Sequence, residues 1–392
     1  MKSSADILFL VFIAGAMFKV LTSTGAIENG IGILVRKFHR KEKSGTTMIY
    51  IMTFVFGLLG AVVGYENNIP FVPIGVMIAL ALGYDLMVGV ALILGSVSVG
   101  FATSPINPYT VGTSDFIAEL PLFSGMGLRT AFCIVSVAVL AHHISQYAKK
   151  VKENPQKSLV KGISTEGFEF TQDINSYKLT SIHKKILTLF VVLVIVIVFG
   201  VVKFHWYLTE MSALFVITGI IARIIAKYDS TKIVKIMIEG AAELTLGALV
   251  IGLARGIQIV LMQGNIGDTI IYTLATPLQH LPVLASAILM SITHGIINFF
   301  IPSGSGQAMT TMPIMIPLSD LVGMTRQTAI LAFQIGDGIM NLVVPTLGGL
   351  LAMLAMAKVP FEKWVRFITP LVAKEVLVGW IFITIAVLTN WS

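Results

Sequence analysis

Long apolar runs, separated by short polar segments, follow one another along the whole chain. The run Ile186–Val202 holds seventeen residues without a charge, and lysines flank it on both sides, at Lys185 and Lys203. This length and these flanks are typical of a membrane-spanning helix. Comparable apolar runs lie at about 7–21, 46–63, 69–82, 86–103, 128–147, 207–226, 241–262, 283–300, 308–318, 328–357 and 365–389.

These runs predict helices, because in lipid only helices and closed barrels satisfy their own backbone polar groups. We therefore expect an all-α polytopic protein of the inner (plasma) membrane, with the lipid bilayer as its surroundings. The composition agrees, since 56% of the residues are hydrophobic and 12% are charged, against about 25% charged in an average soluble domain. A water-exposed surface cannot be built from so few charges.

The numbers and positions of cysteine, histidine and charged residues limit which cofactors and partners the protein can have. The one cysteine, Cys133, excludes a disulfide framework and a cysteine-based metal cluster. The seven histidines are dispersed, without the spacing of metal ligands. We expect no cofactor beyond a coupling ion, Na⁺ or H⁺. The net charge of +7 comes mostly from Lys and Arg in loops, where it sets membrane topology, so we expect no nucleic-acid partner.

Two basic segments predict the cytoplasmic face. Arg36–Lys43 carries five Lys or Arg residues, and Lys149–Lys185 carries eight Lys and four acids. By the positive-inside rule both lie in the cytoplasm.

The run at 7–21 then crosses inward and leaves Met1 outside. Since a charged N-terminus is not normally exported without help, we hypothesise a further helix before Met1, which an upstream reading frame without an apolar span would contradict.

The two halves of the chain share a pattern. Asn68-Ile69-Pro70 matches Asn298 through Pro302, and Gly100 matches Gly336, at an offset of about 230 to 240 residues. Similarity at one fixed offset indicates a duplicated unit.

The units are residues 1–147, expected to lack an N-terminal helix, and residues 186–392, with a cytoplasmic linker at 148–185 between them.

Short apolar arms around an Asn/Pro tip predict re-entrant hairpins, and long runs interrupted by Asn and Pro predict broken helices. The hairpins are expected at 46–82 and 283–318, and the broken helices at 85–120 and 325–357. A hairpin leaves the membrane on the side it entered, so an odd number of crossings separates the copies and inverts the second. Inverted repeats of this kind are the architecture of many secondary transporters, with the site at the midplane.

The hairpin tips hold residues expected to contact substrate. Glu66 is the acid closest to the first tip, and a carboxylate at membrane depth is a functional candidate by default, with a structural ion pair as the alternative. Amide and hydroxyl groups of the tips would cradle the substrate, while Gly304 lets backbone amides approach an anionic group. The tip residues proposed for the site are Glu66, Asn67, Asn68, Asn298, Ser303, Gly304 and Ser305.

The breaks hold the rest of the predicted site. Pro105 and Pro108 cannot continue a regular helix, and the freed backbone groups become available to an ion or substrate. Asp337 would supply charge to an ammonium group or a coupling cation, as would Glu66. A Na⁺ site is expected near Asn107 and Asn341. The break residues proposed for the site are Ser104, Asn107, Asp337, Asn341 and Thr346. Arg255 could serve a substrate carboxylate or neutralise Glu243.

Several strings resemble a known family. NFFIPSGSGQA, LAFQIGDG, the later VPT and GFATSPINP are similar to YfcC-type carriers, which are related to the DcuC anaerobic C4-dicarboxylate carriers of the ion-transporter superfamily. The resemblance runs from about Phe12 to the C-terminus. It implies a scaffold domain and a transport domain with hairpins and broken helices, often in a homodimer that moves by an elevator-like displacement.

The resemblance also implies substrates, namely basic amino acids, as in arginine/ornithine exchange, or C4-dicarboxylates. Relatives often have two consecutive acids at the first tip, where this chain has Glu66-Asn67. The loss of one negative charge should weaken the attraction for a doubly basic substrate.

We therefore expect a secondary active transporter of a small charged organic metabolite, foremost an amino acid of the basic class, working by antiport or by coupling to Na⁺ or H⁺. A C4-dicarboxylate carrier is the alternative. An intramembrane enzyme would need a nucleophile or a metal set such as His-Glu-x-x-His, which the sequence lacks. A channel would not need gates on both sides, which paired hairpins provide.

Overall fold

The computed structural model describes residues 2–39, 44–168, 176–204, 206–245, 248, 249, 256, 260, 263, 264 and 266–392. Within these residues every regular element is a helix. Eight of the helices found there are long and apolar enough to cross a membrane. The all-α membrane fold predicted from the sequence is confirmed.

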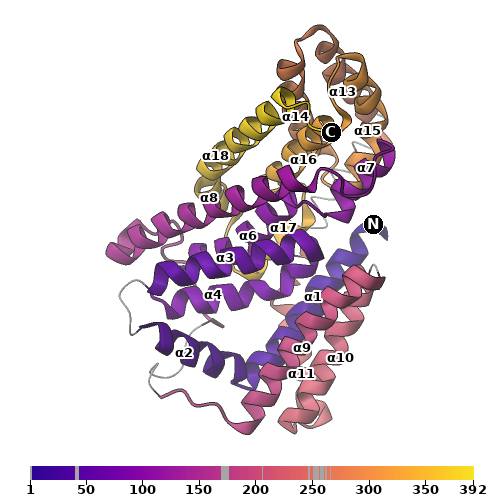
Figure 1. The fold of residues 1–392 in the computed structure, drawn as a ribbon. Helices are drawn as coiled ribbons and strands as arrows, with labels where there is room; N and C mark the ends of the chain where they lie inside the picture. The colour runs from indigo at the N-terminus through magenta and orange to yellow at the C-terminus, as the bar shows by residue number, and fades with distance from the viewer. Residues whose placement is uncertain are drawn as a thin grey trace.

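One group of helices lies in the lower part of Figure 1. It consists of α1 (Lys2–Ser23), α2 (Ala26–His39), α9 (Ser181–Phe204), α10 (Leu208–Ala226) and α11 (Ser230–Ala242). In this group α1 packs against α10 and α11, and α2 packs against α9. Lys19 of α1 forms an ion pair with Glu243, directly after α11. Arg255, the partner considered for Glu243, lies outside the described residues.

The rest of the first half forms the middle of the molecule (Figure 1). Residues 46–82 fold as α3 (Ser44–Val63), the tip η1 (Glu66–Phe71) and α4 (Val72–Ala81). Residues 85–120 fold as α5 (Leu86–Val90), the π-helical η2 (Ala91–Gly95) and α6 (Ser96–Thr103), then a break, then the π-helical η3 (Pro108–Gly112) and α7 (Thr113–Ile117). The long helix α8 (Met126–Glu153) packs against α3 and α6, and the short η4 (Pro155–Lys157) follows it.

The second half repeats this order of elements. After α13 (Ile266–Ala275) and η5 (Thr276–His280), the arms α14 (Val283–Phe300) and α15 (Gly304–Leu321) meet at a second tip. The helices α16 (Arg326–Met340) and α17 (Gly348–Met356) are separated by a break at 341–347, and α18 (Phe361–Leu388) ends the fold. These elements occupy the segments expected to form the second hairpin and broken helix. The inversion of one copy relative to the other stays a prediction.

In each half the first hairpin arm crosses its broken helix at a glycine. A Cβ added to Gly100 of α6 would lie 1.9 Å from the main-chain oxygen of Gly57 in α3. A Cβ added to Gly336 of α16 would lie 2.2 Å from the main-chain oxygen of Ser291 in α14. The two glycines are the positions matched in the sequence repeat. Both crossings therefore depend on a residue without a side chain, since only glycine allows such close backbone approach.

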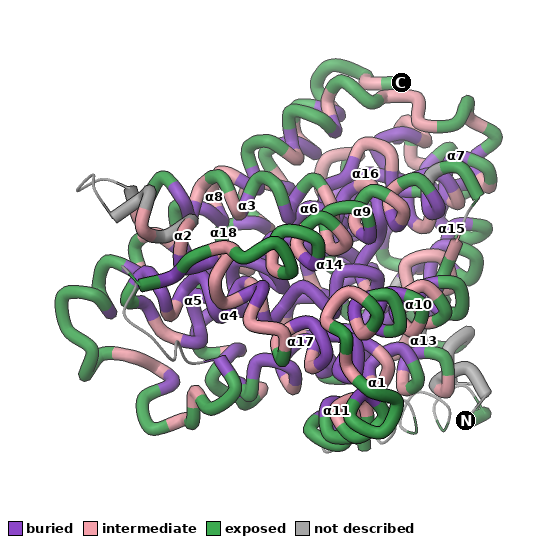
Figure 2. Tube along the Cα trace, turned by 90° about the horizontal axis from the view of Figure 1, so that it is seen from below, coloured by how far each residue is buried: buried purple, intermediate pink, exposed green. Residues whose placement is uncertain are grey.

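The two halves meet at the centre of the molecule, where α6 crosses α16. A Cβ added to Gly338 of α16 would lie 2.5 Å from the Cα of Ala102 in α6. Figure 2 shows that buried positions gather in this central region, around α5, α14 and α16, while exposed positions follow the outer helices. The most apolar stretch within Leu86–Ile117 is completely buried. The broken helices therefore form the core on which the tips rest.

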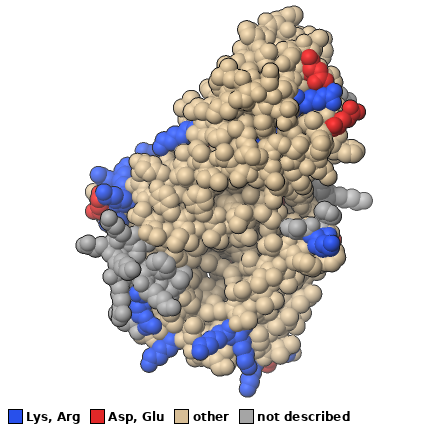
Figure 3. All heavy atoms as spheres, in the orientation of Figure 1, with Lys and Arg blue, Asp and Glu red and all other residues tan. Residues whose placement is uncertain are grey.

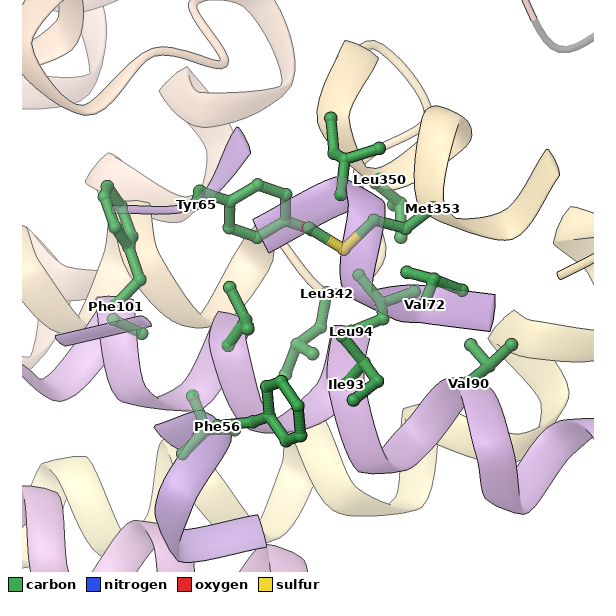
Figure 4. Close-up of a cluster of buried hydrophobic side chains, with 14 of the residues drawn as sticks. Phe56, Tyr65, Val72, Val90, Ile93, Leu94, Phe101, Leu342, Leu350 and Met353 are labelled. Atoms are coloured by element: carbon green, nitrogen blue, oxygen red, sulfur yellow. The ribbon is translucent and has the colours of Figure 1, made fainter. Parts of the chain in front are cut away.

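An apolar cluster fixes the first tip to the second half of the chain. Figure 4 shows Tyr65 beside Leu350 and Met353 of α17, above Ile93 and Leu94 of the broken helix. All five residues are buried. The phenol oxygen of Tyr65 also lies 3.3 Å from the hydroxyl of Ser98 in α6, which donates a hydrogen bond to it. The position of the tip is thus set by packing as well as by chain connection.

Candidate functional site

A cavity of about 60 Å³ lies between the two hairpin tips. The tips, the second break and four aromatic side chains enclose it. Its lining consists of Gly64, Tyr65, Glu66, Asn67, Phe101, Tyr109, Tyr207, Pro302, Ser303, Gly304, Ser305, Asn341 and Leu347. Six of these were predicted as site residues: Glu66, Asn67, Ser303, Gly304, Ser305 and Asn341.

The second tip presents a helix N-terminus to the cavity. Ser303 is the N-cap of α15, and its hydroxyl oxygen accepts a hydrogen bond from the Gly306 amide at 3.3 Å. Gly304 and Ser305 form the first turn, where backbone amides have no partner within the helix. These amides and the aligned peptide dipoles favour a negatively charged group at this end.

A buried carboxylate lies directly behind this tip. The side-chain amide of Asn298 donates to Oδ1 of Asp337 at 2.9 Å and to the side-chain oxygen of Asn341 at 3.2 Å. Oδ2 of Asp337 is buried and accepts no hydrogen bond from any described residue. A Cβ added to Gly304 would lie 3.6 Å from this oxygen. The second tip and the second break thus meet around a carboxylate that has one oxygen available.

The first tip uses its two asparagines to end α3. The side-chain amide of Asn67 donates to the Val63 main-chain oxygen at 2.9 Å, and that of Asn68 donates to the Gly64 oxygen at 2.6 Å. These bonds satisfy carbonyls that have no partner at the helix end. Asn67 lines the cavity, whereas Asn68 does not.

Glu66 begins η1 and is half-buried at the cavity wall. A Cβ added to Gly349, in the first turn of α17, would lie 3.3 Å from Cγ of Glu66. The first tip therefore packs against the start of α17, and this places a carboxylate on the opposite side of the cavity from the second tip.

Like Asn68, three further predicted site residues make structural hydrogen bonds and do not line the cavity. The hydroxyl of Ser104 donates to the Ala61 oxygen at 2.8 Å, and that of Thr346 donates to the Phe299 oxygen at 2.8 Å. Asn107 accepts from the Tyr109 amide at 2.9 Å and donates to the Phe101 oxygen at 3.2 Å, so it joins the two sides of the first break. These side chains hold tip and break in place.

Sequence reasoning missed two residue types in and near the site. Tyr109 and Tyr207 line the cavity with ring centroids 5.8 Å apart. Tyr207 directly precedes α10, which belongs to the other group of helices, and no sequence signal pointed to it. Gln334 is buried in α16, and its side-chain amide donates a hydrogen bond to the Ser104 main-chain oxygen at the first break. A single amide side chain in an otherwise apolar run is a sequence signal that could have identified this residue.

A polar cavity enclosed between two helix-breaking tips, inside a bundle of membrane-spanning helices, is the arrangement of a membrane transporter. The family model of DcuC, the C4-dicarboxylate anaerobic carriers, matches residues 1–388. The chain belongs to this family, and it is a multi-pass membrane transporter and not an enzyme.

Two relatives match nearly the whole chain. An uncharacterized protein of Haemophilus influenzae is 32% identical over 392 residues, which cover 98% of this chain and 76% of the relative. The "Putative basic amino acid antiporter YfcC" of Escherichia coli K12 is 32% identical over 372 residues, which cover 92% of this chain and 73% of that protein. The resemblance to YfcC-type carriers seen in the sequence is confirmed.

Solved structures share the fold. The YdaH transporter of Alcanivorax borkumensis aligns with a TM-score of 0.51 at 16% identity, over 97% of this chain and 85% of that one. MtrF of Neisseria gonorrhoeae, from a class of antimetabolite efflux pumps, aligns with a TM-score of 0.50 at 19% identity, over 97% and 81%. At these identities the likeness establishes the fold alone.

Proposed function

We propose that this chain is a secondary active transporter that carries an amino acid of the basic class through the cavity between its tips. The observation that supports this substrate class is the charge of the lining. Glu66 lines the cavity, Asp337 lies behind it and is linked through Asn298 to the lining residue Asn341, and no Lys or Arg of the described residues lines it. The negative charge of these two acids therefore favours a cationic group of the substrate, because opposite charges attract strongly at membrane depth.

The two ends of an amino acid match the two walls of the cavity. The carboxylate would lie at the N-terminus of α15, near the amides of Gly304 and Ser305. The ammonium or guanidinium group would lie between Glu66 and the available oxygen of Asp337. A coupling cation, Na⁺ or H⁺, would share Asp337 and Asn341 with the substrate.

A C4-dicarboxylate is the second candidate, and one observation favours it. The start of α17 also lies at the cavity, where Leu347 is its N-cap, so two positive helix ends are available for two carboxylates. The two acids near the cavity act against this candidate, because like charges repel and a dicarboxylate would bring two more.

In our proposal the tips separate to admit substrate, because the cavity between them is small. Its volume of about 60 Å³ is well below the roughly 300–1,000 Å³ that is typical of small-molecule pockets. In our proposal the group formed by α1, α2 and α9 to α11 is the scaffold, and a homodimer would form through it. The remaining helices would move as the transport domain in an elevator-like step, with the hairpins as gates.

Uptake into proteoliposomes tests the proposal. Labelled arginine, ornithine, a neutral amino acid and succinate are offered in turn, with Na⁺ or pH gradients or with internal amino acid for exchange. Glu66→Gln is compared with Glu362→Gln, an exposed acid at the start of α18. Saturable uptake of a basic amino acid that is lost only in Glu66→Gln is expected. Succinate uptake alone, unchanged in Glu66→Gln, would overturn the assignment.

A further inference from the structure

A second cavity, of about 350 Å³, lies where α8 ends, away from the tips. It is open to the surface between α8, α18 and the polar segment that follows α8. Its lining consists of His143, Gln146, Tyr147, Lys150, Lys157, Leu159, Arg366 and Phe367. None of these residues lines the cavity between the tips.

One face of α8 forms the back of this basic pocket. His143, Gln146, Tyr147 and Lys150 are spaced by three, one and three residues, so all four project from the same side of the helix. The His143 ring nitrogen Nε2 lies 3.1 Å from the main-chain oxygen of Phe367 in α18, within hydrogen-bond distance. This contact fixes α18, and with it Arg366, beside the face of α8.

The polar segment after α8 is held over the pocket by a hydrogen-bond network. Oδ2 of Asp85 accepts from the hydroxyl of Tyr147 at 2.7 Å and from that of Ser158 at 2.6 Å. The Leu159 amide donates to the Tyr147 oxygen at 3.0 Å. Lys157, directly before Ser158, is thereby kept at the pocket wall. The pocket is a built feature of three chain segments.

Positive charge gathers in this pocket. Within the described chain, Lys150, Lys157 and Arg366 make no ion pair. Asp85 already accepts from two hydroxyl groups, and the nearby Glu153 is paired with Lys149 at 3.9 Å. Figure 3 shows Lys and Arg side chains gathered at the end of the molecule where α8 ends. Three cationic side chains around one pocket favour the binding of an anion between them.

We propose that this basic pocket binds a phosphate group, supplied by the headgroup of an anionic phospholipid. Arg366 offers the planar fork of donors that suits phosphate oxygens, and the two lysines add point charges. The positive-inside rule predicts that this end of α8 faces the cytoplasm, where basic pockets between membrane helices bind lipid headgroups.

An exposed apolar surface further along α18 favours a lipid over a soluble phosphate. Along α18 toward the membrane interior, Leu377 and Ile381 are exposed, and at 11 and 15 residues from Arg366 they project from the same side of the helix as this arginine. These side chains can lie against the acyl chains of a lipid whose headgroup occupies the pocket. A bound lipid would then join α8, α18 and the segment at Lys157, and so stabilise this part of the fold.

Native mass spectrometry and thermal unfolding of the purified full chain test the proposal. The triple variant Lys150→Gln/Lys157→Gln/Arg366→Gln is compared with the control Lys152→Gln/Lys178→Gln/Lys363→Gln, which removes the same charge from exposed positions on α8, the linker and α18. The probes are phosphatidylglycerol, phosphatidylcholine and inorganic phosphate.

Retention of phosphatidylglycerol by wild type and control, with affinity about a hundredfold lower in the triple variant, is expected from three cations near the surface. The unfolding temperature should rise with phosphatidylglycerol only where the lipid is retained. Equal retention by both variants, or equal retention of phosphatidylcholine, would overturn the proposal. If inorganic phosphate were the only probe to raise the unfolding temperature, and did so in the wild type but not in the triple variant, the lipid would be excluded as the source of the bound phosphate group.

Discussion

The side-chain amide of Gln334 donates a hydrogen bond to the main-chain oxygen of Ser104 at 2.7 Å, across 230 positions of the sequence. Ser104 follows the last residue of α6, where the first break leaves carbonyls without a helical partner. Gln334 lies in the broken helix of the other half. One half of the chain therefore satisfies a backbone group that the break in the other half has freed.

Replacement of Gln334 by leucine should destabilise the fold. The variant leaves the Ser104 oxygen without this donor in a buried environment, which costs about 1–3 kcal/mol. Thermal unfolding in detergent, followed by tryptophan fluorescence, measures the change. Gln279→Leu, at an exposed position of η5, is the control and should unfold near the wild-type temperature. Equal effects of the two substitutions would show that the bond contributes little.

Replacement of Gly336 by alanine should destabilise the packing of α14 on α16. The added methyl group would lie 2.2 Å from the Ser291 oxygen and 2.6 Å from Cβ of His294, so one helix must shift, at a cost of about 1–3 kcal/mol. Gly127 of α8 has no atom within 4 Å of its added Cβ, and Gly127→Ala should leave stability unchanged or slightly higher. A Gly336→Ala protein as stable as Gly127→Ala would contradict the close crossing.

Asp337→Asn should abolish transport and preserve the fold. Asparagine keeps a side-chain oxygen that can accept from Asn298, but it offers no charge to a cation. The expected result is a loss of at least tenfold in the initial uptake rate with an unfolding temperature close to wild type. Asp320→Asn, at an exposed acid that pairs with Arg326 at 2.8 Å, should retain uptake. Normal transport by Asp337→Asn would remove this carboxylate from the proposed mechanism.

Glu375→Leu should raise stability. Both carboxylate oxygens of Glu375 are buried in α18, where Ser136 of α8 is the polar side chain beside them, and no hydrogen bond of good geometry reaches them within the described residues. Leucine of similar volume removes these unsatisfied polar atoms, and we expect a gain of about 1–3 kcal/mol. The exposed Glu362 of the same helix gives the control, Glu362→Leu, with a change of about 0.5 kcal/mol or less. A lower unfolding temperature in Glu375→Leu would mean that the carboxylate has a stabilising partner.

Apolar runs were enough to predict the helical membrane fold, because lipid leaves the backbone few alternatives. The pairing of Gly100 with Gly336 in the sequence also corresponds to two equivalent helix crossings. By contrast, α2 and α11 were not predicted. Their apolar residues lie on one face only, and such helices do not form the continuous apolar runs from which spans were inferred.

The site could be predicted only in part. Tip residues such as Ser303 and Asn67 stand out because polar residues near helix breaks are rare in membrane segments. Ser104 and Asn107 carry the same signal, yet they bond to nearby backbone groups, since a break needs its own hydrogen bonds before it can serve a ligand. Sequence alone does not separate these two uses of one residue type. Tyr207 reaches the cavity only through tertiary packing.

The position of Tyr207 has a consequence for how the binding site changes during a transport cycle. Among the described residues, every other lining residue belongs to the tips and the broken helices, whereas Tyr207 directly precedes α10. If the two groups of helices slide past each other, the tips keep their composition while the wall supplied by Tyr207 is exchanged for another surface. The chemical environment of the bound substrate would then differ between the two faces of the membrane. The affinity for the substrate would differ as well, although the tip residues that bind it do not rearrange.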